Sequence, residues 1–322
     1  MKLSRLVDQL KNQYPWEQKQ FIQELSASWS SHVQTADGRD VMLGDDAAAI
    51  PSKGSYLLLA SELILPDLVQ NKPEMAGRSA VLANVNDIYA MGGRPVAIQD
   101  VMLSSNAEHV DRLQNGLDEG SRRYDVPVVG GHLTKNESAP VLGASILGEA
   151  ENLLSSSQVE SGQKLLVATH LQGEFRTGYS FWSCTEHRSN TEIRGDLSLL
   201  AELAEDELCS AAKDISMAGL IGTILMLLEP TSSGADIDLP SIPSPAEAEN
   251  RLLDWLTAFP SYGFVLAVDP GTVETVQTRF DERSITCEVV GTVTDTARVV
   301  LGDGADRETV WDFSKSPFTG FG

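Results

Sequence analysis

The sequence predicts an α/β protein of two domains, of which the first is built on a mixed sheet. Its 322 residues are enough for two domains of ordinary size. In the first half, apolar runs of strand length alternate with amphipathic runs of helix length. A serine-rich polar stretch at 155–162 interrupts this pattern, so we expect domains at 1–154 and 155–322.

The elements of the first half follow from the spacing of its apolar residues. The first 31 residues show helical spacing that is broken near Pro15, which predicts two short helices. A long helix is expected from Pro73, which suits a first turn, to Met91, because the glycine pair at 92–93 ends it. A charged amphipathic helix is expected at 108–124. Strands are expected at 41–43, 56–59, 95–103, 126–129 and 141–148.

The second half is expected to mix strands and helices as well. A polar segment rich in Gly, Thr and Ser, 171–195, predicts a long loop, and such loops often carry function. Two glycines, Gly302 and Gly304, predict a hairpin over 299–313. Helices are expected at 197–212, 218–228, 245–259 and 273–283, and strands at 165–168, 235–239, 264–268 and 287–293.

Composition excludes several classes of protein. No apolar run approaches the ~20 residues that span a bilayer, and the N-terminus has no signal-peptide core, so we expect a cytoplasmic protein. Three cysteines without a CxxC pair argue against a disulfide framework or a cysteine zinc site. A formal net charge of −22 repels nucleic acid and anionic membranes, and we expect neither as a partner. The same charge repels ATP, so bound phosphates need local neutralisation by Mg²⁺ held on carboxylates.

Four short stretches carry the polar residues that we single out. Phosphoryl transfer needs positioned phosphates and Mg²⁺, and Mg²⁺ prefers carboxylate oxygens. Three of the stretches supply one such carboxylate each, and we expect these three carboxylates to hold Mg²⁺. They are Asp46 in GDDA (44–47), Asp87 in LANVNDIYAMGG (82–93) and Asp214 in KDIS (213–216). The fourth stretch is GGH (130–132).

Backbone and hydroxyl groups in these stretches suit the binding of phosphate. Gly130 and Gly131 let backbone N–H groups approach a phosphate without a Cβ in the way, and Ser216 offers a hydroxyl. Adjacent side chains of an extended segment point to opposite faces, so Asp45 and Asp46 are not both ligands, and one of them is a capping or structural group. The sequence contains no P-loop motif, and no G-x-G-x-x-G follows an expected strand.

Each stretch also has an ordinary structural explanation. The two aspartates at 45–46 are also typical of a turn and helix cap, and the glycines at 130–131 of a plain turn. Asp214 and Ser216 are typical caps for the apolar helix expected from residue 218, and a lone His132 is more often a half-buried histidine than a catalyst. The residues alone therefore leave the nucleotide site and the ordinary turns both open.

The order of these motifs resembles that of the AIR synthase (PurM-like) superfamily. GDDAAAI, NVNDIYAMGG, VVGGHLTKN, KDISMAGLIGTIL and SSGADIDLPSIP follow one another over about residues 40–300. Within the superfamily, thiamine-monophosphate kinase looks closest. The resemblance implies ATP bound with Mg²⁺ at the interface of a homodimer. It also implies a PurM-like two-domain fold whose N-terminal sheet pairs with its twin into a β-barrel, followed by an α+β C-terminal domain.

The resemblance assigns roles residue by residue. Ser216 falls where that kinase family contacts ATP, and Gly131 and His132 fall where its Gly-Asp touches nucleotide and metal. The positions that hold metals in that family are Asp46, Ser61, Glu62, Asp87 and Asp214.

The sequence departs from the kinase pattern at several of these positions. His132 replaces an aspartate, Met217 replaces the second aspartate of D-x-S-D-G, and Glu62 replaces the usual aspartate. The arginine expected before the C-terminal domain is missing from the serine-rich run at 155–157. The segment that helps to hold thiamine phosphate is replaced by FPSYG at 259–263.

These observations predict an ATP- and Mg²⁺-dependent phosphotransferase or ATP-activating synthetase, similar to thiamine-monophosphate kinase. His132 and Asp87 are the expected catalytic residues, and a small, phosphorylated metabolite is expected to approach near Tyr262 and the 171–195 segment. A true thiamine-monophosphate kinase is the narrower version. The alternatives are a catalytically degenerate, dimeric nucleotide- or metabolite-binding protein, and an ordinary two-domain protein whose four stretches are turns and caps.

Overall fold

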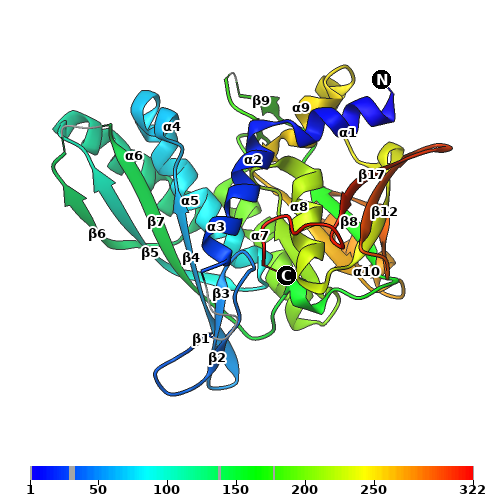
Figure 1. The fold of residues 1–322 in the computed structure, drawn as a ribbon. Coiled ribbons are helices and arrows are strands. Elements are labelled where there is room, and N and C mark those ends of the chain that lie inside the picture. The colour runs from blue at the N-terminus through cyan, green and yellow to red at the C-terminus, as the bar shows by residue number, and fades with distance from the viewer. Residues whose placement is uncertain (1, 29–32, 137–138, 177, 322) are drawn as a thin grey trace.

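The computed structural model describes residues 2–28, 33–136, 139–176 and 178–321. It has two α/β halves, each built around its own sheet (Figure 1). Several sheets mix parallel and antiparallel pairs, which confirms the predicted α/β class with mixed sheets.

A five-stranded sheet and three helices form the N-terminal half. The strand order is β3-β4-β7-β5-β6, and only β5 and β6 are parallel. The strands are β3 (Ala48–Ser52), β4 (Ser55–Leu63), β5 (Arg94–Leu103), β6 (Val128–Thr134) and β7 (Val141–Ala150). The helices are α4 (Pro66–Asn71), α5 (Pro73–Ala90) and α6 (Ala107–Tyr124). A separate pair of short strands, β1 (Val33–Gln34) and β2 (Asp40–Val41), precedes them.

Helix α5 lies at the centre of this half and packs tightly against α6. A Cβ at Gly116 would lie 2.1 Å from the Glu74 carbonyl oxygen, and one at Gly77 would lie 2.3 Å from that of Leu113. The two helices therefore approach backbone to backbone only because both positions are glycine. This close packing holds α5, with its buried Asp87, firmly against the sheet.

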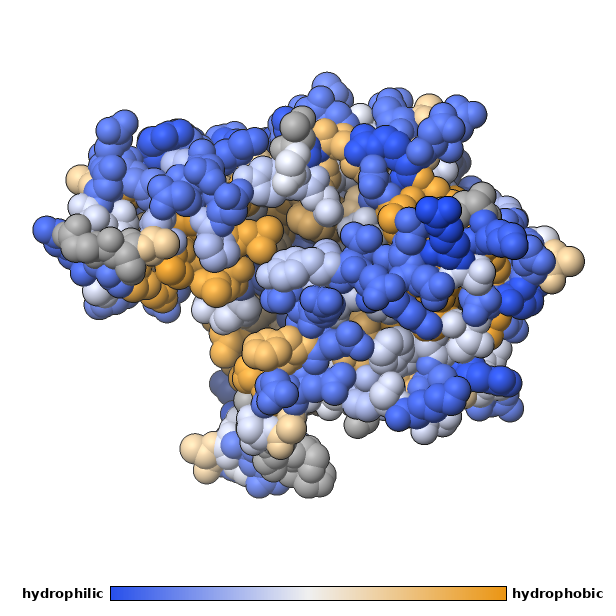
Figure 2. Space-filling model, turned by 45° about the horizontal axis from the view of Figure 1, so that its top comes forward, coloured by the Kyte–Doolittle hydropathy of each residue, from blue (hydrophilic) through white to orange (hydrophobic). Residues whose placement is uncertain are grey.

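The other face of the N-terminal sheet carries no helix among the described residues. Side chains alternate along its strands, and those that point away from α5 are apolar and exposed. They include Leu59, Leu63, Val96, Val101, Val129 and Leu147, which we call the outer apolar face. Figure 2 shows apolar side chains gathered on this lobe. The sheet does not close into a barrel within the described part of one chain.

The C-terminal half contains a seven-stranded sheet in the order β11-β14-β8-β15-β12-β16-β17. Its strands are β8 (Lys164–Thr169), β11 (Ala211–Asp214), β12 (Gly234–Asp238), β14 (Gly263–Val268), β15 (Thr286–Thr294), β16 (Arg298–Asp303) and β17 (Asp306–Asp312). Its helices are α7 (Asn190–Glu205), α8 (Gly219–Leu228), α9 (Leu252–Thr257) and α10 (Val273–Asp281), and a small sheet joins β9 (Glu174–Phe175), β10 (Phe181–Ser183) and β13 (Phe259–Pro260). Short 3-10 turns lie at Ser156–Gln158, Glu229–Thr231, Leu239–Ser241 and Ala246–Ala248.

The first helices pack on the C-terminal half, although they open the chain. They are α1 (Leu3–Lys11), α2 (Tyr14–Phe21) and α3 (Gln23–Ser26). Trp16 is buried in the same core cluster as α8 and the last strands, and its ring meets that of Phe318 edge-on at 5.3 Å. The boundary between residues 154 and 155 stays a prediction, but these contacts place α1 and Trp16 in the core of the other half.

Most predicted elements are confirmed, and three expected elements differ in the structure. The helix expected at 197–212 begins at Asn190 and ends at Glu205, because residues 211–214 form β11, an edge strand of the seven-stranded sheet. The loop expected at 171–195 contains β9, β10 and the start of α7, where Ser189 and Glu192 form a capping box. The helix at 245–259 is reduced to α9. The alternative interpretation of residues 45–46 as a helix cap is not confirmed, because the residues that follow form the strand β3.

Candidate functional site

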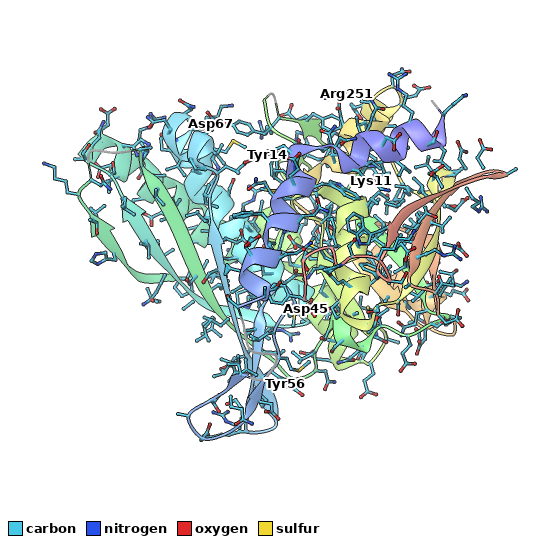
Figure 3. All side chains as sticks on the ribbon, viewed as in Figure 1. Lys11, Tyr14, Asp45, Tyr56, Asp67 and Arg251 are labelled. Carbon is cyan, nitrogen blue, oxygen red and sulfur yellow. The ribbon has the colours of Figure 1, made fainter. Side chains whose placement is uncertain are left out.

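The three aspartates predicted to hold Mg²⁺ come together between the two halves of the chain. Asp46 lies in the bend between β2 and β3, Asp87 in the last turn of α5, and Asp214 at the end of β11. Their ligand oxygens all lie within 4.8 Å of one another. We call these three residues the carboxylate cluster. Figure 3 shows the neighbouring Asp45 in the middle of the molecule, between the N-terminal sheet and the C-terminal half.

Asp45 and Asp46 have the separate roles that their adjacency predicts. Asp45 Oδ2 accepts hydrogen bonds from the Ser156 backbone N–H at 2.7 Å and from the hydroxyls of Ser156 and Ser155 at 2.8 and 3.2 Å. Asp46 instead faces Asp87 and Asp214. Asp45 is thus the structural member of the pair, and it ties the loop at 44–47 to the start of the C-terminal half.

A buried lysine faces both aspartates of the loop. Lys213 Nζ lies 3.1 Å from Asp45 Oδ1 and 2.5 Å from Asp46 Oδ1, and the residue is only 5% exposed. The two carboxylates raise the pKa of Lys213 against the opposing effect of burial, so it remains charged. The sequence analysis missed this residue because its partners are 167 and 168 positions away.

The cluster carries more negative charge than its surroundings neutralise. Burial, followed by repulsion from Glu62, Asp214 and Asp46, raises the pKa of Asp87 well above its usual range. Burial, followed by repulsion from Asp46, raises the pKa of Asp214 to about 8. Burial also raises the pKa of Asp46, although Lys213 opposes this shift. Asp87 Oδ2 is buried without a hydrogen-bond partner in the described part of the chain.

Glu62 adds a further carboxylate beside the cluster, and Lys19 adds a cation. Burial raises the pKa of Glu62, and the charge of Lys19 on α2 lowers the pKa of both Glu62 and Asp214. Lys19 was not predicted either, because nothing in its local sequence links α2 to a loop nearly two hundred residues away.

Ser61, predicted to share a metal with Glu62, points to the opposite face of β4. It is exposed, and its hydroxyl oxygen lies 2.7 Å from that of Ser145 on β7. Successive side chains of a strand alternate between faces, so Ser61 and Glu62 are separated by the sheet. The structure does not bring the Ser61 side chain to the carboxylate cluster.

Gly130, Gly131 and His132 lie on the edge strand β6, away from the cluster. Strands β7 and β5 separate β6 from β4, so β6 is roughly 14 Å from β4 across the sheet. The register pairs His132 with Val101, whose side chain is on the outer apolar face, and His132 Nε2 lies 3.1 Å from the Thr134 hydroxyl. Within one chain, these three residues therefore do not join Asp87.

The turn that follows Asp214 leads directly into helix α8. Ser216 is half-buried, and its carbonyl oxygen accepts a hydrogen bond from the Gly219 N–H at 2.9 Å. Ala218 is fully buried with a φ of 82°, a left-handed conformation that favours glycine. The turn thus places Ser216 near Asp214, and it holds one residue, Ala218, in a strained conformation.

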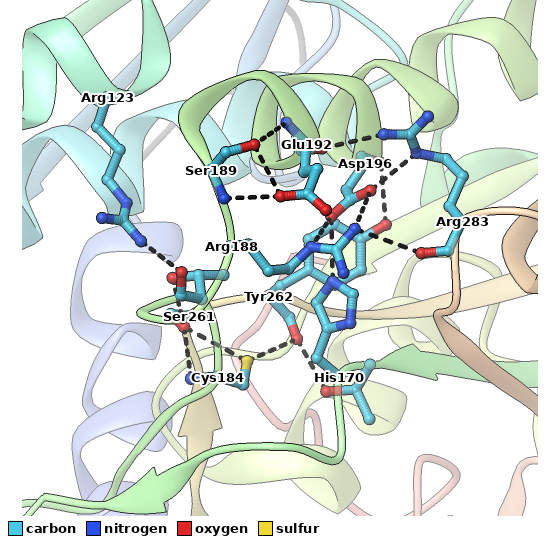
Figure 4. A network of polar contacts seen from close by, with 12 residues as sticks. Arg123, His170, Cys184, Arg188, Ser189, Glu192, Asp196, Ser261, Tyr262 and Arg283 are labelled. Carbon is cyan, nitrogen blue, oxygen red and sulfur yellow. Dashed lines mark hydrogen bonds and ion pairs between the residues drawn. The ribbon is translucent and has the colours of Figure 1, made fainter.

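Tyr262, predicted to lie near the second substrate, is a framework residue. It is 1% exposed, and its hydroxyl donates to the Asp196 carbonyl oxygen at 3.0 Å. Asp196 itself is fully buried and receives His170 Nε2 at 3.1 Å and Arg283 Nε at 2.8 Å, while Arg188 Nε lies 2.7 Å away (Figure 4). This network fixes the segment from β10 to α7.

Models of two protein domains match the chain. That of the AIR synthase related protein N-terminal domain matches residues 44–150, and that of the C-terminal domain matches residues 185–304. An uncharacterized protein of Synechocystis sp. is 39% identical over 304 residues, which cover 94% of both chains. The chain belongs to the AIR synthase-related family. Its relatives include the thiamine-monophosphate kinase of Pyrococcus abyssi, 34% identical over 148 residues that cover 44% of this chain and 46% of that one.

Solved structures show the same PurM-like fold. PurL of T. maritima complexed with ADP superposes with a TM-score of 0.72 at 18% identity and covers 92% of this chain; the chain spans about half the length of PurL, 51%. AaThiL complexed with AMPPCP and TMP superposes with a TM-score of 0.64 at 17% identity over 84% of this chain and 92% of that one. These likenesses confirm the predicted fold. Of the helices that the structure describes, none has the length and apolar character needed to traverse a bilayer.

Proposed function

We propose that the chain binds ATP with Mg²⁺ at the carboxylate cluster and uses it to phosphorylate or activate a small metabolite. The observation that carries the proposal is the meeting of three carboxylates within 4.8 Å, one of which has a buried oxygen without a partner. A divalent cation would satisfy both the excess negative charge and the orphaned oxygen. The likeness to thiamine-monophosphate kinase and to PurL complexed with ADP supports a nucleotide as the ligand.

The chain's own residues would divide the work as follows. Asp46, Asp87 and Asp214 hold the ion, which when bound neutralises phosphate charge. Lys213 fixes the Asp46 carboxylate, and Asp45 fixes the loop that carries it. Ser216, two residues after Asp214, would donate its hydroxyl to a phosphate oxygen.

Calorimetry with a non-hydrolysable ATP analogue tests this site. We expect binding in Mg²⁺ that weakens at least tenfold in EDTA and in Asp87→Asn, because the loss of one ligand typically costs a metal site about that much. Asp111→Asn is the matched control, since Asp111 is an exposed aspartate on α6. Equal binding by Asp87→Asn and the wild type would disprove the assignment of the cluster.

A second candidate function is nucleotide binding without turnover. The Lys213 ammonium already lies on Asp46, and Met217 offers no carboxylate. Both leave fewer oxygens for a second ion. The measurement is ADP formation with a panel of small phosphorylated acceptors that includes thiamine monophosphate. Analogue binding without ADP from any acceptor would favour this candidate, while ADP that depends on thiamine monophosphate would identify a true thiamine-monophosphate kinase.

A second copy of the chain is the proposed partner for the outer apolar face. Leu63 is 67% exposed and Val101 50%, which is costly for a sheet face that remains in water. His132 lies on the same face, so a homodimer would bury it. The predicted role of His132 should therefore be tested in the homodimer. Val101→Asp should convert a dimer into a monomer in light scattering, whereas Val33→Asp, in the separate β1–β2 pair, should not. A wild-type monomer would contradict the proposal.

A further inference from the structure

A cavity of about 250 Å³ lies between helices α5 and α6 and the segment around β10. Ser79 and Leu82 of α5 form one wall, Arg123 of α6 a second, and Phe181 and Ser261 a third. The first two walls belong to the N-terminal half and the third to the C-terminal half. A volume of this size accommodates a small metabolite, and pockets between domains are common ligand sites.

The charged side chains on the cavity wall leave one positive charge in excess. Arg78 pairs with Glu119 at 2.7 Å, and Arg176 pairs with Glu186 at 3.1 Å; all four line the cavity. The third arginine, Arg123, forms no ion pair with a carboxylate anywhere in residues 2–28, 33–136, 139–176 and 178–321. Its guanidinium is therefore available to an anionic group of a ligand in the cavity.

Arg123 is held in position by groups that leave most of its donors free. Its Nη2 donates to the Thr185 carbonyl oxygen at 2.6 Å, which links α6 to the C-terminal half (Figure 4). A guanidinium has five N–H donors, so this bond leaves donors for a bidentate contact. The wall opposite is equally fixed, because Ser261 Oγ accepts from the Cys184 N–H at 3.0 Å and from the Thr185 hydroxyl at 3.1 Å. A preorganised site of this kind binds without first ordering its side chains.

Helix α5 connects the cavity to the carboxylate cluster. Leu82 on the cavity wall precedes Asp87 by five residues, about 7.5 Å along the helix axis. The cavity and the carboxylate cluster are thus two separate places along one rigid helix. Asn86 lies one helical turn after Leu82 on the same face of α5, and its buried Oδ1 has no partner among the described residues.

We propose that this cavity binds an anionic small metabolite, bearing a phosphate or a carboxylate, with Arg123 as the anchor of that group. The identification of this metabolite as the second substrate rests on the proposed function; the anion site itself does not. The neutral or apolar remainder of the ligand lies on Met75, Leu82 and Phe181.

Binding of matched anionic and neutral probes tests the proposal. Ribose 5-phosphate is compared with ribose, and glutarate with 1,5-pentanediol, by calorimetry in EDTA, where the carboxylate cluster holds no divalent cation. We expect at least one anion to bind at least tenfold more tightly than its neutral parent, because it gains a charge-assisted bidentate contact. Arg123→Gln should weaken that anion about tenfold. Arg112→Gln is the matched control, since Arg112 lies on the same helix but pairs with Glu74 at 2.7 Å away from the cavity.

Protection from arginine modification gives a second measurement that needs no variant. Phenylglyoxal labelling of the wild type, read by mass spectrometry, should be suppressed at Arg123 by the bound anion and unchanged at Arg112. The proposal is overturned if neither anion binds better than its parent, or if both arginines are labelled alike with and without the anion. Binding of the ATP analogue in Mg²⁺, measured on the same preparation, separates the proposed function from the proposed anion site. It tests the carboxylate cluster independently of the cavity.

Discussion

Asp196 and the carboxylate cluster are both buried, but they have opposite electrostatic surroundings. Asp196 is fully buried, but hydrogen bonds from His170 and Arg188 outweigh the effect of burial and lower its pKa. Asp87 is also buried, yet its nearest charged neighbours are carboxylates, and its pKa is raised well above the usual range. The first carboxylate is neutralised by the chain itself. The second group is left with a charge that only a proton or a ligand can balance.

The comparison separates a structural site from the proposed binding site on physical grounds. A buried ion pair that is complete stabilises the segment it joins, as the bonds of Asp196 to α7, Arg188 and Arg283 do. A cluster of like charges destabilises the fold until something binds, which is how functional sites often differ from the rest of a protein. Substitutions at the two sites should therefore change stability in opposite directions.

The largest expected effect is the loss of stability in Asp196→Asn. The change leaves Arg188 and Arg283 without a full negative charge in a buried place, which typically costs about 3–5 kcal/mol. The measurement is the free energy of unfolding from urea titration in EDTA. Asp87→Asn is the matched comparison, and it should leave stability unchanged or raise it by about 1 kcal/mol, because it removes repulsion. Equal losses in both variants would break the distinction between the two sites.

A smaller effect is expected in the pH dependence of stability. The pKa of Asp214 is about 8 in the folded chain, against 3.8 for an ordinary aspartate. A raised pKa means that the stability contributed by the protonated group is complete below about pH 4 and is lost as the pH rises through about 8. Asp196, with its lowered pKa, has the opposite sign: its contribution is present above about pH 4 and is lost in acid.

Thermal unfolding between pH 6 and 8.5 checks this expectation. In EDTA, stability should fall by roughly 2 kcal/mol over this range, because the carboxylate cluster has to ionise. Saturating Mg²⁺ should remove most of the fall, since the ion stabilises the ionised form. Asp214→Asn should flatten the EDTA profile. A flat profile in wild-type protein without Mg²⁺ would show that the carboxylates are neutralised in some other way.

The smallest effect concerns the backbone beside the carboxylate cluster. Ala218 has a φ of 82° in a fully buried turn, and glycine adopts this conformation without strain. Ala218→Gly should raise the free energy of unfolding by about 1 kcal/mol. Ser284→Gly is the matched variant beside the Asp196 site. Ser284 follows Arg283, lies on the exposed surface and has a φ of 58°. Lower stability in Ala218→Gly would mean that the methyl group contributes more by packing than it costs in strain.

The fold could be predicted where local signals bound an element on both sides. Pro73 and the glycines at 92–93 set the limits of α5 almost to the residue. Strand β11 was missed because its first residues, two alanines after a charged helix, continue a helical pattern. Only pairing with β14 makes them a strand, and that partner lies about fifty residues further along the chain. Tertiary pairing of this kind outweighs local propensity.

The part of the candidate site that could be predicted consists of residues whose type alone indicates their chemistry. The aspartates at 46, 87 and 214 meet as expected, and the alternation of side chains correctly separated Asp45 from Asp46. The same alternation, applied to Ser61 and Glu62, separates those two residues as well, although the family pattern placed both at the metal. Lys213 and Lys19 reach the cluster through contacts that no local pattern encodes.

The packing of Trp16 has a consequence for the order in which the chain is made and folded. Its ring contacts those of Trp311 and Phe318, about three hundred residues later in synthesis. Helices α1 and α2 therefore cannot bury their apolar side until residues 311–318 have been synthesised. Lys19 lies on one of these helices. A nascent chain thus acquires the complete charge arrangement of the carboxylate cluster only after residues 311–318 have been synthesised.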